Sequence, residues 1–112
     1  MNHLTRLSQD YVRAFHSKDL EAIGSLLAAD FALEDPAGRF EGKQAVLDYI
    51  KGIFRDAGAL TFVARNIIAD EAAGISVIEF ELNLGGAQMI GTDVINWKDG
   101  LMQELRAYVY KA

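Results

Sequence analysis

The sequence predicts an α+β domain in which helices from the front of the chain pack on an antiparallel sheet formed by the back. Apolar residues recur at helical spacing before Gly58, and after it they alternate with a period of two. Short connections such as Asp99-Gly100 then indicate tight turns between the strands of a meander. A chain of 112 residues can form one hydrophobic core, so we expect a single domain over residues 1–112.

Three helices and a short strand are expected before this change of period. The first helix spans about residues 3–16. Asp19 is a suitable N-cap for the second helix, whose apolar side chains are Leu20, Ile23, Leu26 and Leu27. A strand ends at Asp35, before a Pro-Ala-Gly turn, and the third helix runs from near Gly42 to Phe54. The later strands are expected at about residues 60–69, 75–84, 87–97 and 101–110.

Composition narrows the classes of partner and compartment. The formal net charge is -5, and an acidic protein of this kind lacks the basic surface that nucleic acids and anionic membranes require. The chain has no cysteine, so it has neither a disulfide framework nor a thiolate metal site, which fits a reducing compartment. Its N-terminal residues lack the apolar core of a signal peptide, and no apolar run could span a bilayer. We therefore expect a cytoplasmic protein with no nucleic-acid or membrane partner.

Two polar side chains near the front of the chain lie on faces that the pattern marks as apolar. Tyr11 is on the apolar stripe of the first helix, four positions from both Leu7 and Phe15. It is either a core tyrosine bonded to the backbone or a phenol that faces a cavity. Asp35 ends the first strand on the same face as Phe31. It is either a turn residue before the proline or a carboxylate that points into a cavity.

A third polar group, Asp93, lies inside a predicted strand. Aspartate is disfavoured within strands, and a position in the middle of a strand rules out the role of a turn residue. If Asp93 faces the interior, its carboxyl must be paired or protonated, because a buried lone anion is costly. Otherwise the opposite face of the strand is the buried one. The alternation groups Asp93 with Met89, Gly91, Ile95 and Trp97.

These three groups would form a set for moving protons if they met in one apolar pocket. Burial raises the pKa of a carboxyl group, so one aspartate can stay neutral as a donor while the other acts as a base. Chemistry that needs this division is proton abstraction next to a carbonyl, with donors that stabilise the enolate oxygen.

Three stretches carry a resemblance to the bacterial steroid Δ5-3-ketosteroid isomerases, within the SnoaL-like/NTF2-like superfamily. They are "DYVRAFHSKDLEAI", "LLAADFALEDPAGRFEG" and "GTDVINWKDG". The resemblance implies a cone-shaped, cystatin-like fold with three N-terminal helices on a curved, mainly antiparallel sheet. It also implies Asp35 as general base, Tyr11 and Asp93 as oxyanion hole, and Phe80, in "EFEL", as a pocket residue. The implied reaction moves a proton within an enolisable cyclic ketone through a dienolate, with no cofactor.

Two departures from these isomerases would change the cavity wall. Ile50 stands where they have a second supporting tyrosine, and Tyr49 is displaced by about 100° around the helix. Val109 stands where they have an aromatic residue. We expect Ile50, Val109 and Phe80 to contact a small apolar carbonyl ligand, and Trp97 either to join them or to lie in the core. The fold is also compatible with a non-catalytic ligand-binding or dimerisation domain, or with a polyketide cyclase or dehydratase.

The remaining polar side chains indicate no further site. His3 and His16 have no partner at metal-ligand spacing, so we expect surface histidines and no metal. Glu79 and Glu81 alternate with Phe80 and are expected on the opposite face of the sheet. That face also offers an apolar surface, and the resemblance implies a homodimer formed through it. Its apolar members are Ile75, Val77 and Ile90.

Overall fold

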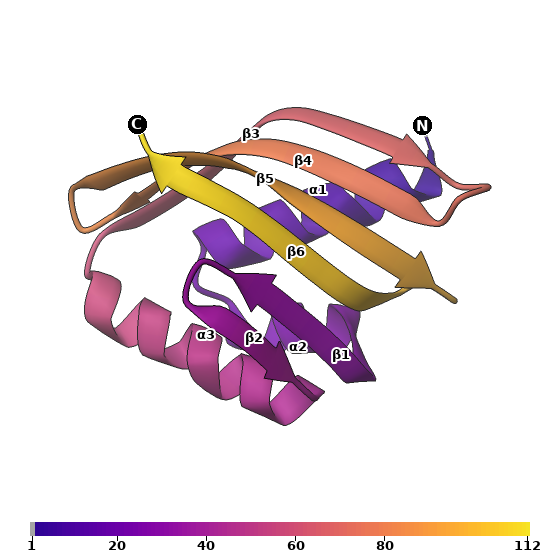
Figure 1. Cartoon of the computed structure of the whole chain (residues 1–112), viewed down its shortest axis with the longest axis horizontal. Helices are drawn as coiled ribbons and strands as arrows, with labels where there is room; N and C mark the ends of the chain where they lie inside the picture. Colours follow the sequence, from indigo (N-terminus) through magenta and orange to yellow (C-terminus); the bar gives the residue numbers. More distant parts are fainter. Residues whose placement is uncertain (1) are drawn as a thin grey trace.

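The computed structural model describes residues 2–112, and within them it has three helices and six strands (Figure 1). The helices are α1 (His3–His16), α2 (Leu20–Leu26) and α3 (Lys43–Ala57). The strands are β1 (Leu27–Asp35), β2 (Gly38–Glu41), β3 (Leu60–Asp70), β4 (Ile75–Leu84), β5 (Ala87–Lys98) and β6 (Leu101–Lys111).

Side-chain caps fix where the first two helices begin. The Asn2 side chain accepts a hydrogen bond from the Leu4 amide at 2.8 Å at the start of α1. Asp19 accepts one from the Ala22 amide at 3.0 Å, which confirms it as the N-cap of α2. The second helix is shorter than predicted, because Leu27 already belongs to β1. Within residues 2–112, no helix is both long enough and apolar enough to cross a membrane.

The six strands form one sheet in the order β2-β1-β6-β5-β4-β3. Strands β3 to β6 form the predicted antiparallel meander, and the α+β class is confirmed. Strand β1 joins the sheet by parallel pairing with β6, with Leu33 aligned to Leu105. Strand β2 pairs antiparallel with β1 in a stretch that was expected to be turn and loop. Its four residues are mostly exposed and show no apolar alternation that could have indicated a strand.

The helices cover one face of the sheet, and the hydrophobic core lies between these two layers (Figure 1). Strand β4 shows the alternation that this arrangement requires, because Ile78 and Phe80 are buried while Glu79 and Glu81 are exposed. The predicted orientation of the two glutamates is therefore confirmed. The largest fully buried apolar side chains are Ile23, Phe31, Val46, Ile78, Ile95, Met102 and Leu105.

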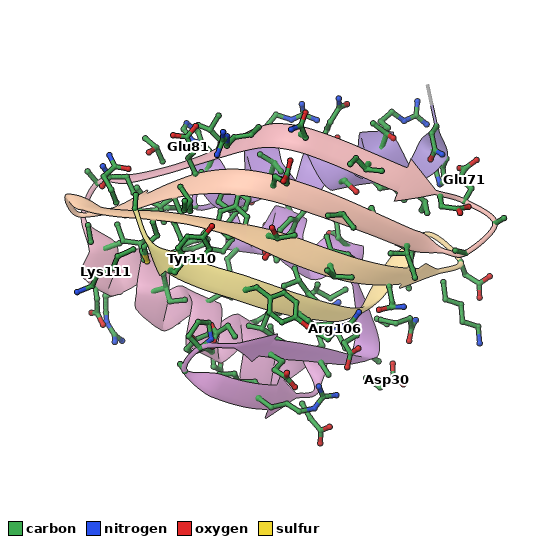
Figure 2. All side chains as sticks on the ribbon, turned by 45° about the horizontal axis from the view of Figure 1, so that its top comes forward. Asp30, Glu71, Glu81, Arg106, Tyr110 and Lys111 are labelled. Carbon is green, nitrogen blue, oxygen red and sulfur yellow. The ribbon has the colours of Figure 1, made fainter. Side chains whose placement is uncertain are left out.

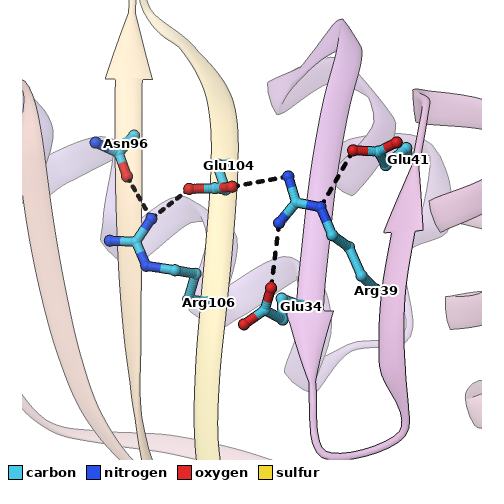
Figure 3. Close-up of polar contacts among 6 residues, drawn as sticks. All are labelled: Glu34, Arg39, Glu41, Asn96, Glu104 and Arg106. Atoms are coloured by element: carbon cyan, nitrogen blue, oxygen red, sulfur yellow. Dashed lines mark hydrogen bonds and ion pairs between the residues drawn. The ribbon is translucent and has the colours of Figure 1, made fainter.

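Charged side chains link neighbouring strands on the face opposite the helices, here called the outer sheet face (Figure 3). Arg39 of β2 is the centre of this network, and Glu104 of β6 accepts from both Arg39 and Arg106. These pairs raise the pKa of Arg39 and lower that of Glu104. Such exposed pairs contribute little stability one by one, but together they connect β2, β1, β6 and β5. The other contacts are Arg39 to Glu34 at 3.3 Å, Arg39 to Glu41 at 3.1 Å and Arg106 to Asn96 at 2.9 Å.

Candidate active site

A cavity of about 300 Å³ lies on the helix-covered side of the sheet. Its volume is at the lower end of the range that is usual for small-molecule sites. Four of its lining side chains are polar, namely Tyr11 from α1, Asp35 from β1, Tyr49 from α3 and Asp93 from β5. The three polar groups that the sequence singled out therefore line one cavity. Its apolar wall includes Phe15, Leu33, Ile50, Ile53, Phe62, Phe80, Leu105 and Val109.

Tyr11 and Asp93 are the buried polar groups of this cavity. Their side chains are only 6% and 3% exposed, respectively. Among residues 2–112 neither has a hydrogen-bonding partner, yet neither is an enclosed unsatisfied group, because both reach the cavity. Buried polar groups in proteins are normally paired, so two such groups facing a cavity instead of a protein partner mark this cavity as the candidate site.

Burial determines the protonation state of both groups. Desolvation, followed by repulsion from Asp35, raises the pKa of Asp93 to about 8. Desolvation, followed by the charge of Asp93, raises the pKa of Tyr11 well above its usual value. At neutral pH both groups are therefore mainly protonated, and each has an O–H to donate into the cavity.

Asp35 combines the two roles that the sequence left open. Its Oδ1 accepts a hydrogen bond from the Ala37 amide at 2.8 Å, as a turn residue does. Its Oδ2 accepts one from the Tyr49 hydroxyl at 2.6 Å and lies at the cavity wall. The half-buried carboxylate is thus held at a defined place by the turn on one side and by α3 on the other.

Tyr49 is the polar cavity residue to which the sequence assigned no role. Its ring stacks on Phe40 of β2 with centroids 4.0 Å apart and an interplanar angle of 17°. Desolvation, followed by the hydrogen bond to Asp35, raises the pKa of the Tyr49 hydroxyl, so it remains a donor. The sequence did place Tyr49 next to the cavity-facing Ile50 on α3. Its contact with Asp35 depends on how the β1–β2 hairpin packs on that helix, which no local pattern reports.

The predicted binding residues fall into two places. Phe80, Ile50 and Val109 line the cavity. Trp97 does not, and its indole Nε1 instead donates to Ser76 Oγ at 2.8 Å in the core. Trp97 shares the inward face with Asp93, but four strand residues separate them by about 13 Å. A bulge between Asn96 and Trp97 adds to the displacement.

A glycine beside Asp93 gives the Phe80 ring its position. Gly91 of β5 pairs with Phe80 of β4, and the ring covers the place where a side chain would stand. A Cβ atom added to Gly91 would lie 2.8 Å from Phe80 Cζ and 2.5 Å from the carbonyl oxygen of Tyr108. Only glycine fits so close to the Phe80 ring and the Tyr108 backbone. The absence of a side chain at Gly91 thus lets the Phe80 ring form the cavity wall next to the buried carboxyl group.

The histidines contribute nothing to this cavity. The exposed His16 accepts a hydrogen bond from the Phe62 amide through Nδ1 at 3.1 Å, and so links α1 to β3. Among residues 2–112 no group of three or more histidine, aspartate and glutamate side chains is placed to hold a metal ion. The chemistry available in the cavity is therefore that of one held carboxylate and two buried O–H donors.

Comparisons with known proteins agree with this architecture. The model of the SnoaL-like domain family matches residues 8–105. A SnoaL-like protein of unknown function from Burkholderia thailandensis E264 has a TM-score of 0.83 at 22% identity, covering 94% of this chain and 92% of that one. A Kribbella flavida DSM 17836 protein, provisionally named a ketosteroid isomerase, has a TM-score of 0.85 at 20% identity, covering 98% and 79%.

The same fold occurs with a different name in a third similar structure. An M. tuberculosis epoxide hydrolase of the LEH-like type has a TM-score of 0.80 at 19% identity, covering 96% of this chain and 83% of that one. A search among curated proteins finds no significant sequence match. These structural likenesses define the fold and not the activity. The solved structures share its NTF2-like fold, as the sequence predicted. The family match covers most of the sequence, and the chain therefore belongs to the SnoaL-like family.

Proposed function

We propose that the protein is a ketosteroid isomerase-like enzyme that acts on a compact, enolisable cyclic ketone. The observation that carries the proposal is the placing of one carboxylate, Asp35, and two neutral donors, Tyr11 and Asp93, around the same apolar cavity. A site that only binds a neutral ligand has no need of a base beside two donors for its oxygen.

In this reaction Asp35 takes a proton from the carbon between the carbonyl group and a β,γ double bond. The bond electrons form a dienolate, whose oxygen accepts hydrogen bonds from Tyr11 and Asp93. Asp35 then returns the proton to the far carbon of the former double bond, giving the conjugated ketone. The proton and electrons balance within the substrate, so no cofactor is needed. Tyr49 acts as a positioning residue, because it holds Oδ2 of the base.

The direct test is conversion of 3-cyclohexenone, followed by the ultraviolet absorption of its conjugated product. Asp35→Asn should lower turnover by about 10²-fold or more, which is the usual contribution of a positioned general base. Asp30→Asn is the matched control, since Asp30 is an exposed aspartate on the same strand and should have no effect. An Asp35→Asn variant that keeps the wild-type rate would contradict the proposal.

Binding of phenols tests the two donors without turnover. A phenolate resembles the dienolate, so it should bind with a shift in its ultraviolet absorption as the phenol loses its proton. Tyr11→Phe and Asp93→Ala should each weaken this binding by about 1–3 kcal/mol, the cost of an unmet buried hydrogen bond. Phenolate binding without any turnover would favour the alternative of a non-catalytic ligand-binding domain.

We also propose a homodimer formed through the outer sheet face. Apolar side chains there are accessible, including Ile68 and Tyr110, each 64% exposed, and Tyr108 at 57%. Figure 2 places Tyr110 and the charged Arg106 together on this face. Exposed apolar surface of this kind commonly marks an interface. Sedimentation equilibrium should give twice the chain mass at micromolar concentration, and a stable monomer there would contradict the dimer.

A further inference from the structure

Two of the side chains that line the cavity are acidic. Asp35 and Asp93 are carboxylic acids, and no lysine, arginine or histidine is among the lining residues. Both oxygens of Asp35 already accept hydrogen bonds, from Tyr49 and Ala37. The nearly fully buried Asp93 has none from residues 2–112 and faces the empty space. Asp93 is therefore the carboxyl group of this cavity to which no described residue donates a hydrogen bond.

Aromatic rings form part of the wall of the same cavity. The ring centroids of Phe62 and Phe80 are 4.9 Å apart, those of Phe15 and Phe62 are 5.0 Å apart, and Tyr11 lies edge-on to Phe62 at 6.2 Å. All four rings line the cavity. Aromatic faces attract cations through their negative quadrupole, and this attraction is strongest where water is excluded.

We propose that this cavity also binds compact hydrophobic ammonium ions, with the ammonium group on the Asp93 carboxylate and the apolar part among the rings. The ammonium N–H groups would donate to an acceptor that lacks a protein partner. A charge-assisted hydrogen bond of this type is stronger than one between neutral groups. This property is independent of the isomerase proposal, because it requires no proton transfer to or from carbon.

The cavity would then accept ligands of opposite charge in its two protonation states. Neutral Asp93 donates to an oxyanion, whereas ionised Asp93 accepts from an ammonium ion. The polar groups facing it are Tyr11 from α1, Asp35 from β1 and Tyr49 from α3, while its sheet neighbours Ile78 and Ala107 are apolar. Of these groups Asp35 is the second carboxyl, and no basic side chain among the lining residues would repel a bound cation.

The pH dependence follows from the ionisation of Asp93. Burial raises the pKa of this carboxyl to about 8, so binding of an ammonium ion at pH 7 must release a proton from Asp93. The affinity should rise roughly tenfold per pH unit up to about pH 8 and then level off, as long as the amine stays protonated.

The test is titration calorimetry with benzylamine, using benzyl alcohol as a neutral ligand of nearly equal size. At pH 8 we expect benzylamine to bind at least tenfold more tightly than benzyl alcohol, with proton release at pH 7 detected as different heats in two buffers. Asp93→Asn should abolish the preference for the amine, because the neutral amide cannot carry the negative charge that the ammonium group meets. Asp48→Asn, at an exposed position on α3, is the control and should leave this preference unchanged.

Equal affinities for the amine and the alcohol at pH 8 would overturn the proposal. So would an amine preference that persists in Asp93→Asn. If that variant does not fold, the wild-type protein still decides the question. Benzylamine binding that releases no proton and does not strengthen between pH 6 and pH 8 would exclude ionised Asp93 as its partner. None of these results depends on whether the ketone is turned over.

Discussion

Two sets of buried polar side chains lie between α1 and the sheet, and they differ in how they are satisfied. Ser8 and Trp97 are each 2.8 Å from Ser76 Oγ, so this set completes its hydrogen bonds within the protein. One turn further along α1, Tyr11 lies beside a cavity with Asp93 and has no such partner. The first set is thus satisfied by protein groups, whereas the second, equally buried, faces the cavity without a protein partner.

Only the set that faces the cavity, Tyr11 and Asp93, is expected to lower the stability of the folded protein. A satisfied polar cluster holds the helix in register without an unpaired group. Burial of a carboxyl group without a partner disfavours its ionised form, and this makes the free energy of unfolding depend on pH. The contrast can be tested by changing one group at a time and measuring both stability and ligand binding.

The largest expected effect is the pH dependence that Asp93 imposes on stability. Its pKa is raised in the folded state from 3.8 to about 8, so the folded protein holds a proton that the unfolded chain has released. The free energy of unfolding should therefore fall as the pH rises from about 4 to about 8, by at most about 1.4 kcal/mol per pH unit. Asp93→Asn should remove this slope in urea titrations. An unchanged slope would mean that Asp93 is ionised in the folded protein.

A smaller effect is expected in the satisfied set. Ser76→Ala removes the group that both Ser8 and Trp97 contact, so the free energy of unfolding should fall by about 1–3 kcal/mol at every pH. Phenol binding should stay at the wild-type level, because Ser8, Ser76 and Trp97 do not line the cavity. A loss of phenol binding in a folded Ser76→Ala protein would show that the two sets are coupled, and the comparison would fail.

The smallest expected effect concerns Tyr49, which belongs to neither set and donates a hydrogen bond to Asp35, the proposed base. Tyr49→Phe keeps the ring that stacks on Phe40 and removes the hydroxyl bonded to Asp35. We expect kcat to fall about tenfold, or about 1.4 kcal/mol, with little change in KM or Tm. Added to Asp35→Asn, the substitution should have no further effect. Additive losses in the double variant would show that Tyr49 acts independently of Asp35.

Local patterns predicted most of the fold. The alternation in β4, with Phe80 inward and Glu79 outward, and the turn at Asp99-Gly100 were sufficient to predict the meander. The short strand β2 was missed because four mostly exposed residues carry no period. The parallel pairing of β1 with β6 was also beyond such reasoning, because it joins segments far apart in the sequence.

The site was predicted less completely, for a similar reason. Tyr11 and Asp93 were identified because each breaks a periodic apolar face, which is a local signal. The role of Tyr49 depends on contacts with Asp35 and Phe40 across the β1–β2 hairpin, and these are tertiary. Trp97 was placed on the correct face of β5, but the distance along that strand puts it in the Ser76 cluster.

The parallel pairing of β1 with β6 has a consequence for how the chain matures. Leu33, two residues before Asp35, pairs with Leu105 across this contact, so β1 has its full place in the sheet only once β6 has been synthesised. Tyr11 and α1 leave the ribosome long before that moment. The cavity, whose lining includes Leu33 of β1 and Leu105 of β6, can therefore take its described form only when both strands are in the sheet.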